Sequence, residues 1–119
     1  MPNVLIIMES NSLQKSLLRA VAHSFTATAC NTIGKAAMLL ASNPNALILD
    51  LSSVGKDGLA FLEQYALQLP PVVLVLSCVT SPDVLWQLSR LQVDAVVRIP
   101  CTASEVAKRL EEYFLAGAI

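Results

Sequence analysis

Three polar residues follow short apolar runs, and their side chains suit one kind of chemistry. Glu9 comes soon after the first run, while Asp50 and Ser77 directly follow two later ones. If these runs are parallel strands, their carboxyl ends meet at one edge of a sheet. Two carboxylates and a hydroxyl there would offer the oxygen ligands that Mg²⁺ prefers. A carboxylate beside such a cation can also act as a nucleophile, as in aspartyl-phosphate chemistry. The structural alternative is that Asp50 only caps a strand or turn.

A regular alternation of strands and helices must position these residues. Short apolar or alternating runs predict strands, and longer amphipathic stretches between them predict helices. The expected strands are residues 4–7, 25–30, 46–49, 72–76 and 94–99. The expected helices are residues 10–24, 32–42, 57–68, 81–92 and 102–117. The third helix is expected to begin at Asp57, after a polar loop that follows Asp50.

This alternation predicts an α/β fold in which helices cover both faces of a parallel sheet. The three most apolar runs should be central strands, and the alternating "FTATAC" (25–30) should lie at an edge. Right-handed crossovers then favour a flavodoxin-like, doubly wound, five-stranded sheet of order 2-1-3-4-5 with five helices. We expect one domain over residues 1–119, with a ligand crevice beyond the carboxyl ends of strands 1 and 3.

Composition excludes several classes of function. The 119 residues are 55% hydrophobic, with eight basic and nine acidic side chains, so no electrostatic support for nucleic-acid binding exists. The apolar runs are too short to span a bilayer, and the N-terminus lacks the features of a signal peptide. Three cysteines with no metal-ligand spacing favour a reduced, cytoplasmic setting.

Four segments together resemble response-regulator receiver domains. "NVLIIMESNSLQKSLLRAV" resembles their first strand and helix, and "ALILDLSSVGKDGLAFL" resembles the phosphoacceptor segment. "PPVVLVLSCVT" resembles the strand that ends in the Ser/Thr switch, and "DAVVRIPC" resembles the last strand with its Lys-Pro turn. The resemblance covers essentially the whole chain, and the segment around Asp50 is its most specific part.

The resemblance implies roles for four residues. Asp50 matches the phosphoacceptor, and Ser77 matches the hydroxyl that bonds the phosphoryl group on activation. Glu9 matches the second residue of the acidic pair that binds Mg²⁺. Ser52 matches the position whose backbone carbonyl completes the metal site. The implied cofactor is therefore Mg²⁺, bound by Glu9, Asp50 and the Ser52 carbonyl.

Three positions depart from the pattern of the family. Met8 replaces the first acid of the pair, and a neutral thioether is a poor ligand for a hard cation. Ile99 replaces the lysine that pairs with the phosphoryl group. Val96 replaces the switch aromatic. We expect Met8 to weaken Mg²⁺ binding, so Met8→Asp should tighten it.

Two basic residues, Arg98 and Lys56, are candidate replacements for the missing lysine. Arg98 neighbours Ile99, but adjacent strand residues point to opposite faces, which makes Arg98 a poor substitute. Lys56, in the predicted loop after Asp50, is a weak candidate for the cation. The alternative is that Lys56 is a solvated loop residue with no role at the site. The resemblance also implies a cis peptide before Pro100.

Two functions remain open at this point. The first is a receiver module of a two-component system or phosphorelay, with Asp50 accepting a phosphoryl group from a histidine kinase or phosphotransfer protein. The second is a phosphorylation-independent pseudo-receiver that acts as a protein-interaction module. A small α/β enzyme has little support, because the sequence has no glycine-rich phosphate loop and no readable Ser/His/Asp arrangement.

The last two helices carry more apolar residues than one buried stripe requires. In helix 81–92 these are Val84, Leu85, Trp86, Leu88 and Leu91. In helix 102–117 they are Val106, Leu110, Tyr113, Phe114 and Leu115. We expect a homodimer or another association through the face made by the fourth helix, fifth strand and fifth helix. The alternative is that these side chains pack inward and the protein is a monomer.

Overall fold

Five strands and five α-helices alternate along the chain in a computed structural model. It describes residues 2–9, 11–77, 82–91, 93–99 and 101–117, without the side chains of residues 11, 53–56 and 115–117. The strands are β1 (Asn3–Ile7), β2 (Thr26–Cys30), β3 (Ala46–Asp50), β4 (Val72–Ser77) and β5 (Ala95–Arg98). The helices are α1 (Asn11–Val21), α2 (Ile33–Leu40), α3 (Leu51–Gln64), α4 (Pro82–Ser89) and α5 (Ala103–Gly117), with a short 3₁₀ helix η1 (Ala66–Gln68).

The strands form one parallel sheet in the order β2-β1-β3-β4-β5, which confirms the predicted topology. The central strands β3 and β4 are buried over their whole length, as continuous apolar runs require when both faces are covered. Strand β2 alternates exposed and partly buried residues and lies at one edge, as its sequence predicts.

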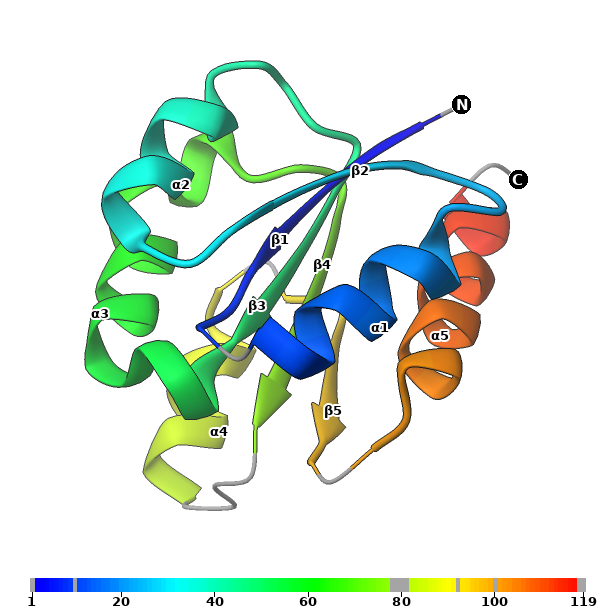
Figure 1. Cartoon of the computed structure of the whole chain (residues 1–119). Helices are drawn as coiled ribbons and strands as arrows, with labels where there is room; N and C mark the ends of the chain where they lie inside the picture. Colours follow the sequence, from blue (N-terminus) through cyan, green and yellow to red (C-terminus); the bar gives the residue numbers. More distant parts are fainter. Residues whose placement is uncertain (1, 10, 78–81, 92, 100, 118–119) are drawn as a thin grey trace.

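Helices cover both faces of the sheet (Figure 1). On one face, α1 and α5 contribute Leu17, Val21, Val106 and Leu110 to a buried cluster with alternate strand residues. On the other face, α2, α3 and α4 pack against the remaining strand residues, and Phe61 is the largest buried side chain there. The chain therefore has two cores, one on each side of the sheet. No helix in the described part of the chain has the length and apolarity needed to cross a membrane.

The third helix differs from the sequence-based expectation. It begins at Leu51, directly after β3, so the predicted polar loop before Asp57 is wrong. The Asp50 side chain caps the helix by accepting a hydrogen bond from the Ser52 amide at 2.9 Å. An N-cap satisfies one of the amides that the first helical turn leaves unpaired, so the helix can start without a connecting loop. The helix also ends earlier, and the stretch predicted as its last turn forms η1.

Candidate functional site

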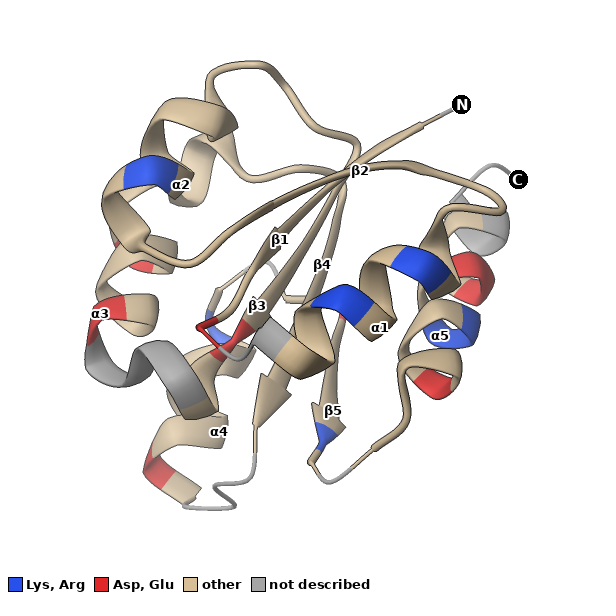
Figure 2. Cartoon of the chain, in the orientation of Figure 1, with Lys and Arg blue, Asp and Glu red and all other residues tan. Residues whose placement is uncertain are grey.

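The predicted site residues lie at the carboxyl edge of the sheet. Asp50 is the last residue of β3, Ser77 is the last residue of β4, and Glu9 lies just beyond β1. Asp50 pairs in register with Leu76, so Ser77 lies one position further along the neighbouring strand. Acidic positions follow β1 and end β3 on the same side of the molecule (Figure 2). The topology thus brings together three residues that are far apart in the sequence.

Asp50 and Ser77 are buried, whereas Glu9 is exposed. Among the described residues, Asp50 and Ser77 are the buried polar side chains, at 3% and 2% exposure. A buried carboxylate requires hydrogen-bond partners, and the Ser52 amide is one partner of Asp50. The Ser77 carbonyl accepts a hydrogen bond from the Ile99 amide at 3.1 Å, which continues the pairing of β4 with the chain beyond β5.

Asp50 and Ser77 belong to opposite faces of the sheet. Along β3, Asp50 alternates in phase with Ala46 and Ile48, which pack on the side of α1 and α5. Along β4, Ser77 alternates in phase with Val73 and Val75, which pack on the side of the other three helices. The two side chains can meet only at the end of the sheet, where the strands stop.

This arrangement recurs in solved structures. A CheY-like receiver domain protein from Methanospirillum hungatei JF-1 has a TM-score of 0.85 and 14% identity, covering 95% of this chain and 93% of that chain. The receiver domain of the Francisella response regulator 1452 has a TM-score of 0.83 and 17% identity, covering 98% and 99%. The chain has the fold of response-regulator receiver domains. A response regulator from Thermotoga maritima, at a TM-score of 0.77 and 16% identity, has the same fold over 94% and 96% of the two chains.

The chain also matches part of one longer curated protein. The chain is 27% identical over 117 residues to protein-glutamate methylesterase/protein-glutamine glutaminase 1 of Geobacter metallireducens. The match covers 94% of this chain but 32% of that protein, so the chain spans about a third of its length. No protein-family model matches the chain.

Two positions that carry charge in the receiver pattern are filled by packed apolar side chains. Met8 is fully buried in the cluster on the α1 and α5 side. Ile99 packs partly buried against the same cluster. Since Ile7 pairs in register with Leu49, Met8 lies level with Asp50. The side of the sheet to which Asp50 belongs is therefore apolar at both positions.

The metal ligands expected from the receiver pattern stay a prediction. Ser52 lies in the first turn of α3, which directly follows the cap residue Asp50. The described residues contain no group of three or more His, Cys, Asp and Glu side chains placed to hold a metal. Glu9 and Asp50, the two carboxylates expected to hold Mg²⁺, both lie at this edge of the sheet.

Glu9 faces a polar hollow beside the start of α2. The hollow measures ≈ 310 Å³ and is lined by Glu9, Asp57 and the segment from Asn31 to Gly34. Thr32 caps α2 there by accepting a hydrogen bond from the Lys35 amide at 3.3 Å. Asp57, expected at the start of a helix, lies instead in its second turn and lines this hollow.

The two candidate replacements for the missing lysine, Lys56 and Arg98, lie on different elements. The Lys56 side chain lies outside the described residues, but its backbone is in α3 rather than in a loop. Six residues of helix place that backbone about 9 Å along the axis from Asp50. Arg98 is exposed and pairs in register with Ser77. The expected cis peptide involves Pro100, which also lies outside the described residues.

The switch position of the receiver pattern is filled by Val96. This residue is half-buried and packs on the α2, α3 and α4 side, against the same cluster as Leu88. A valine in this packed position has no ring to rotate between inner and outer positions.

Two residues at the edge were missed by the sequence analysis. Gln14 donates hydrogen bonds from its side-chain amide to the carbonyls of Met8 at 3.1 Å and Cys30 at 3.3 Å, which joins the ends of two strands to α1. Cys101 packs against the α1 and α5 cluster, and burial raises the pKa of its thiol, with further contributions from Glu105 and Asp50. Cys101 lies two residues after Ile99, and this spacing is the sequence feature that could have identified it as a residue of this edge.

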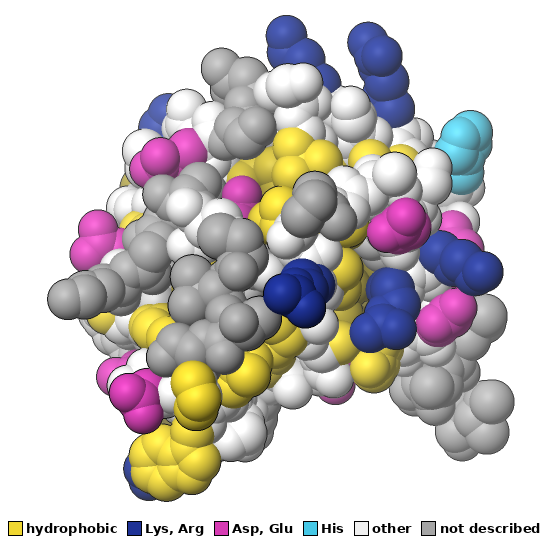
Figure 3. All heavy atoms as spheres, turned by 90° about the horizontal axis from the view of Figure 1, so that it is seen from below, with side chains coloured by type: hydrophobic (Ala, Val, Ile, Leu, Met, Phe, Trp, Pro, Cys, Tyr) yellow, Lys and Arg dark blue, Asp and Glu magenta, His cyan; other side chains and the backbone are white. Residues whose placement is uncertain are grey.

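The expected association face divides into two different surfaces. On α4, Leu85 is 42% exposed and Trp86 is 62% exposed, with Arg90 stacked 4.9 Å from the Trp86 ring centroid. Trp86 lines a hollow of ≈ 270 Å³ with Glu63 of α3, so it lies toward α3. Figure 3, viewed from the carboxyl edge, shows hydrophobic side chains gathered on part of this surface.

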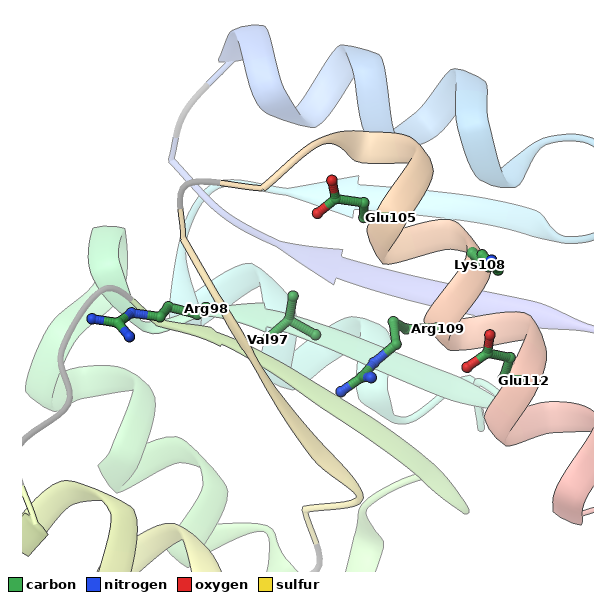
Figure 4. Close-up of a pocket in the computed structure, with 6 residues that line it drawn as sticks. All are labelled: Val97, Arg98, Glu105, Lys108, Arg109 and Glu112. Carbon is green, nitrogen blue, oxygen red and sulfur yellow. The ribbon is translucent and has the colours of Figure 1, made fainter.

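The second surface, between β5 and α5, is charged. Of the apolar residues expected in excess on α5, Val106 and Leu110 are fully buried, and Tyr113 and Phe114 pack partly buried against the core. The side chain of Leu115 lies outside the described residues. A hollow of ≈ 440 Å³ is lined by Val97, Arg98, Glu105, Lys108, Arg109 and Glu112. Arg98 extends away from α5, whereas Arg109 and Glu112 reach from the helix toward the strand (Figure 4).

Proposed function

We propose that this chain is a signalling module with the receiver fold that acts through protein contacts and does not depend on phosphorylation of Asp50. One observation carries the proposal: Met8 and Ile99 pack as apolar side chains on the side of the sheet to which Asp50 belongs. These are the positions at which the receiver pattern places an acid for the metal and a lysine for the phosphoryl group.

Phosphoryl transfer requires neutralisation of the charge on the transferred group. A metal ion and charge-assisted hydrogen bonds normally supply it. Here Met8 contributes no charge to a metal site, and Ile99 offers no hydrogen bond. A phosphoryl group on Asp50 would therefore have few stabilising contacts, and transfer to this carboxylate would be slow.

A second candidate function is a working switch with Asp50 as phosphoacceptor. The placement of Asp50 and Ser77 at adjoining strand ends favours it. A histidine kinase or phosphotransfer protein would donate the phosphoryl group, and the Ser77 hydroxyl would bond it. Mg²⁺ would then depend on Glu9 and Asp50, and its affinity would be low because Met8 contributes no negative charge to the site.

The exposed residues of α4 support contact with another signalling protein. An exposed tryptophan beside an exposed leucine is unusual on a monomer and is common at contact surfaces.

We assign no nucleic-acid partner, because basic and acidic residues are nearly balanced. We also assign no catalytic activity to this chain, and we place the module in the cytoplasm. The esterase activity in the name of the curated relative is a property of that much longer protein.

Incubation with acetyl phosphate and Mg²⁺, followed by intact-mass measurement, tests the proposal. We expect no phosphoryl adduct on the wild-type protein. A wild-type adduct that disappears in Asp50→Asn would overturn the proposal and establish the second candidate.

Two restoring variants sharpen this experiment. Ile99→Lys returns the cation at a partly buried position, and Met8→Asp with Ile99→Lys also returns the acid. Adducts on these variants that require Asp50 would show that the lost charges, rather than the fold, prevent phosphorylation. Circular dichroism must first establish that both variants fold, since Met8 is fully buried. If folded variants also gain no adduct, Met8 and Ile99 are not the cause.

A further inference from the structure

Strand β2 presents an unprotected edge of the sheet. It is the first strand in the spatial order, and among the described residues only β1 pairs with it (Figure 1). The segment from Ser24 to Gly34 contains no charged residue, no histidine and no proline. Charges and prolines are the usual means by which edge strands avoid pairing with other chains. The opposite edge differs, because β5 follows Asp94 and ends at Arg98.

Hydrogen bonding within the sheet identifies the outward-facing main-chain groups. The Thr26 amide donates to the Pro2 carbonyl at 2.9 Å, and the Cys30 carbonyl accepts from the Met8 amide at 3.1 Å. In a parallel pair, alternate residues direct their main-chain groups to the same neighbour. Thr26, Thr28 and Cys30 therefore bond toward β1, and Ala27 and Ala29 direct their amides and carbonyls outward.

We propose that two copies of this chain associate by antiparallel pairing of their β2 edges. A two-fold axis at Thr28 places Thr28 opposite its counterpart and Ala27 opposite Ala29 of the second copy. The outward-facing alanines are then the residues that exchange main-chain hydrogen bonds, as an antiparallel pair requires. Thr28 forms a close, non-hydrogen-bonded pair, and such Thr–Thr pairs are favourable.

The partner is a second copy of this chain, because the sequence of β2 is compatible with itself in an antiparallel pair. In "TATAC" (26–30) small and polar residues alternate. In the antiparallel pair, therefore, no two large side chains and no two like charges face each other. Thr26 and Thr28 are exposed and Ala27 and Ala29 are half-buried, so a second strand can approach. The paired sheets would be continuous, with the two Asp50 edges at opposite ends and α4 of each copy far from the contact. Self-association therefore leaves the surface of α4 open to other partners.

Sedimentation velocity over a range of protein concentrations tests the proposal. We expect a species of about twice 12.7 kDa that increases with concentration up to about 1 mM, as for a small interface. Added salt should not weaken it, since the contact contains no ion pair. Amide hydrogen exchange at Ala27 and Ala29 should slow as the concentration rises. A monomer throughout this range would overturn the proposal.

Two variants and a control locate the contact. Thr28→Lys sets two ammonium groups directly opposite each other and should weaken association by about tenfold or more. Ala29→Pro removes an outward donor without breaking a bond to β1 and should have the same effect. Ser104→Lys adds the same charge at an exposed position of α5 and should leave association unchanged. A dimer that persists in folded Thr28→Lys and Ala29→Pro would overturn the proposal.

Discussion

The buried carboxylate of Asp50 has a structural role as well as a possible chemical one. It ends a fully buried strand and caps α3 through the Ser52 amide. The structural alternative that the sequence left open is therefore confirmed in part: Asp50 does cap an element. Capping does not exclude chemistry, since a carboxylate has a second oxygen with further acceptor capacity.

The cap predicts how substitutions at Asp50 change stability. Asp50→Ala should lower the free energy of unfolding by about 1 kcal/mol, because the first turn of α3 loses its acceptor. Asp50→Asn should retain most of the wild-type stability, since its side-chain oxygen can still accept the bond. Urea denaturation measures both. Thr32→Ala, which removes the cap of α2, provides a matched comparison and should cost a similar amount. Wild-type stability in Asp50→Ala would mean that the cap contributes nothing.

The reactivity of the Cys101 thiol reports on the negative charges of Asp50 and Glu105 near it. Burial, Glu105 and Asp50 all raise the pKa of its thiol above the ordinary value, so the thiolate is scarce at neutral pH. Glu105→Gln and Asp50→Asn each remove a negative charge and should lower this pKa. Iodoacetamide should then label Cys101 faster at a given pH, with Glu105→Gln the faster of the two variants.

Mass mapping of the labelled peptides assigns the label to each thiol. Cys30 is the internal control, because its pKa is affected by burial, Thr32 and Lys35 rather than by either carboxylate. Unchanged labelling of Cys101 in both variants would mean that neither carboxylate influences this thiol.

At the scale of elements, the direct passage from β3 into α3 has the largest effect on the site. It places Ser52 in the first turn of a helix and the backbone of Lys56 further along the same helix. A polar stretch such as "LSSVGKDG" (51–58) contains turn-favouring residues, so local preference alone favours a loop. The cap from Asp50 and burial of Leu51 against the core favour the helix instead.

A substitution at Gly34 tests where the first turn of α2 begins. Gly34 lies in this turn, and a Cβ added there would meet nothing within 4 Å. Gly34→Ala should therefore raise the free energy of unfolding by about 0.5 kcal/mol, because alanine loses less backbone entropy in a helix. Thermal or urea unfolding against the wild type measures the change. A decrease in stability would indicate that α2 begins after residue 34.

At the scale of the whole molecule, the sheet separates two cores with different roles. The α1 and α5 side contains the apolar replacements beside Asp50, and the other side contains Ser77 and supports the exposed part of α4. Burial of Cys30 on one side and Cys101 on the other raises both thiol pKa values. Both cores therefore contribute to the response of stability to alkaline pH.

Stability should fall as the pH rises above the ordinary thiol pKa of 9.0. A thiol whose pKa is raised in the folded state ionises first in the unfolded state. The stabilising contribution is thus complete below the unfolded pKa and is lost as the pH rises toward the folded one. Urea denaturation between pH 7 and 10.5 measures this. The folded variant Cys30→Ala with Cys101→Ala should lose stability less steeply, and an equal slope would contradict the assignment.

The sequence alone determined the class of fold and the location of the site. Continuous apolar runs identify strands buried on both faces, and the alternation of β2 identifies an edge, because these patterns reflect which faces of each element meet the core. Right-handed crossovers then fix the strand order and bring Asp50 and Ser77 to one edge. Each of these inferences depends on local periodicity and chain connectivity, which a sequence contains directly.

Only the tertiary structure decided what surrounds Asp50. The burial of Met8, the position of Cys101 and the place of Ser52 in the first turn of α3 depend on strand register and on where a helix begins. The expected association face divided for the same reason: α5 turned its apolar residues inward, while α4 left Trp86 exposed toward α3. Apolar content gives the number of side chains available for burial, but the packing of neighbouring elements determines which of them are covered.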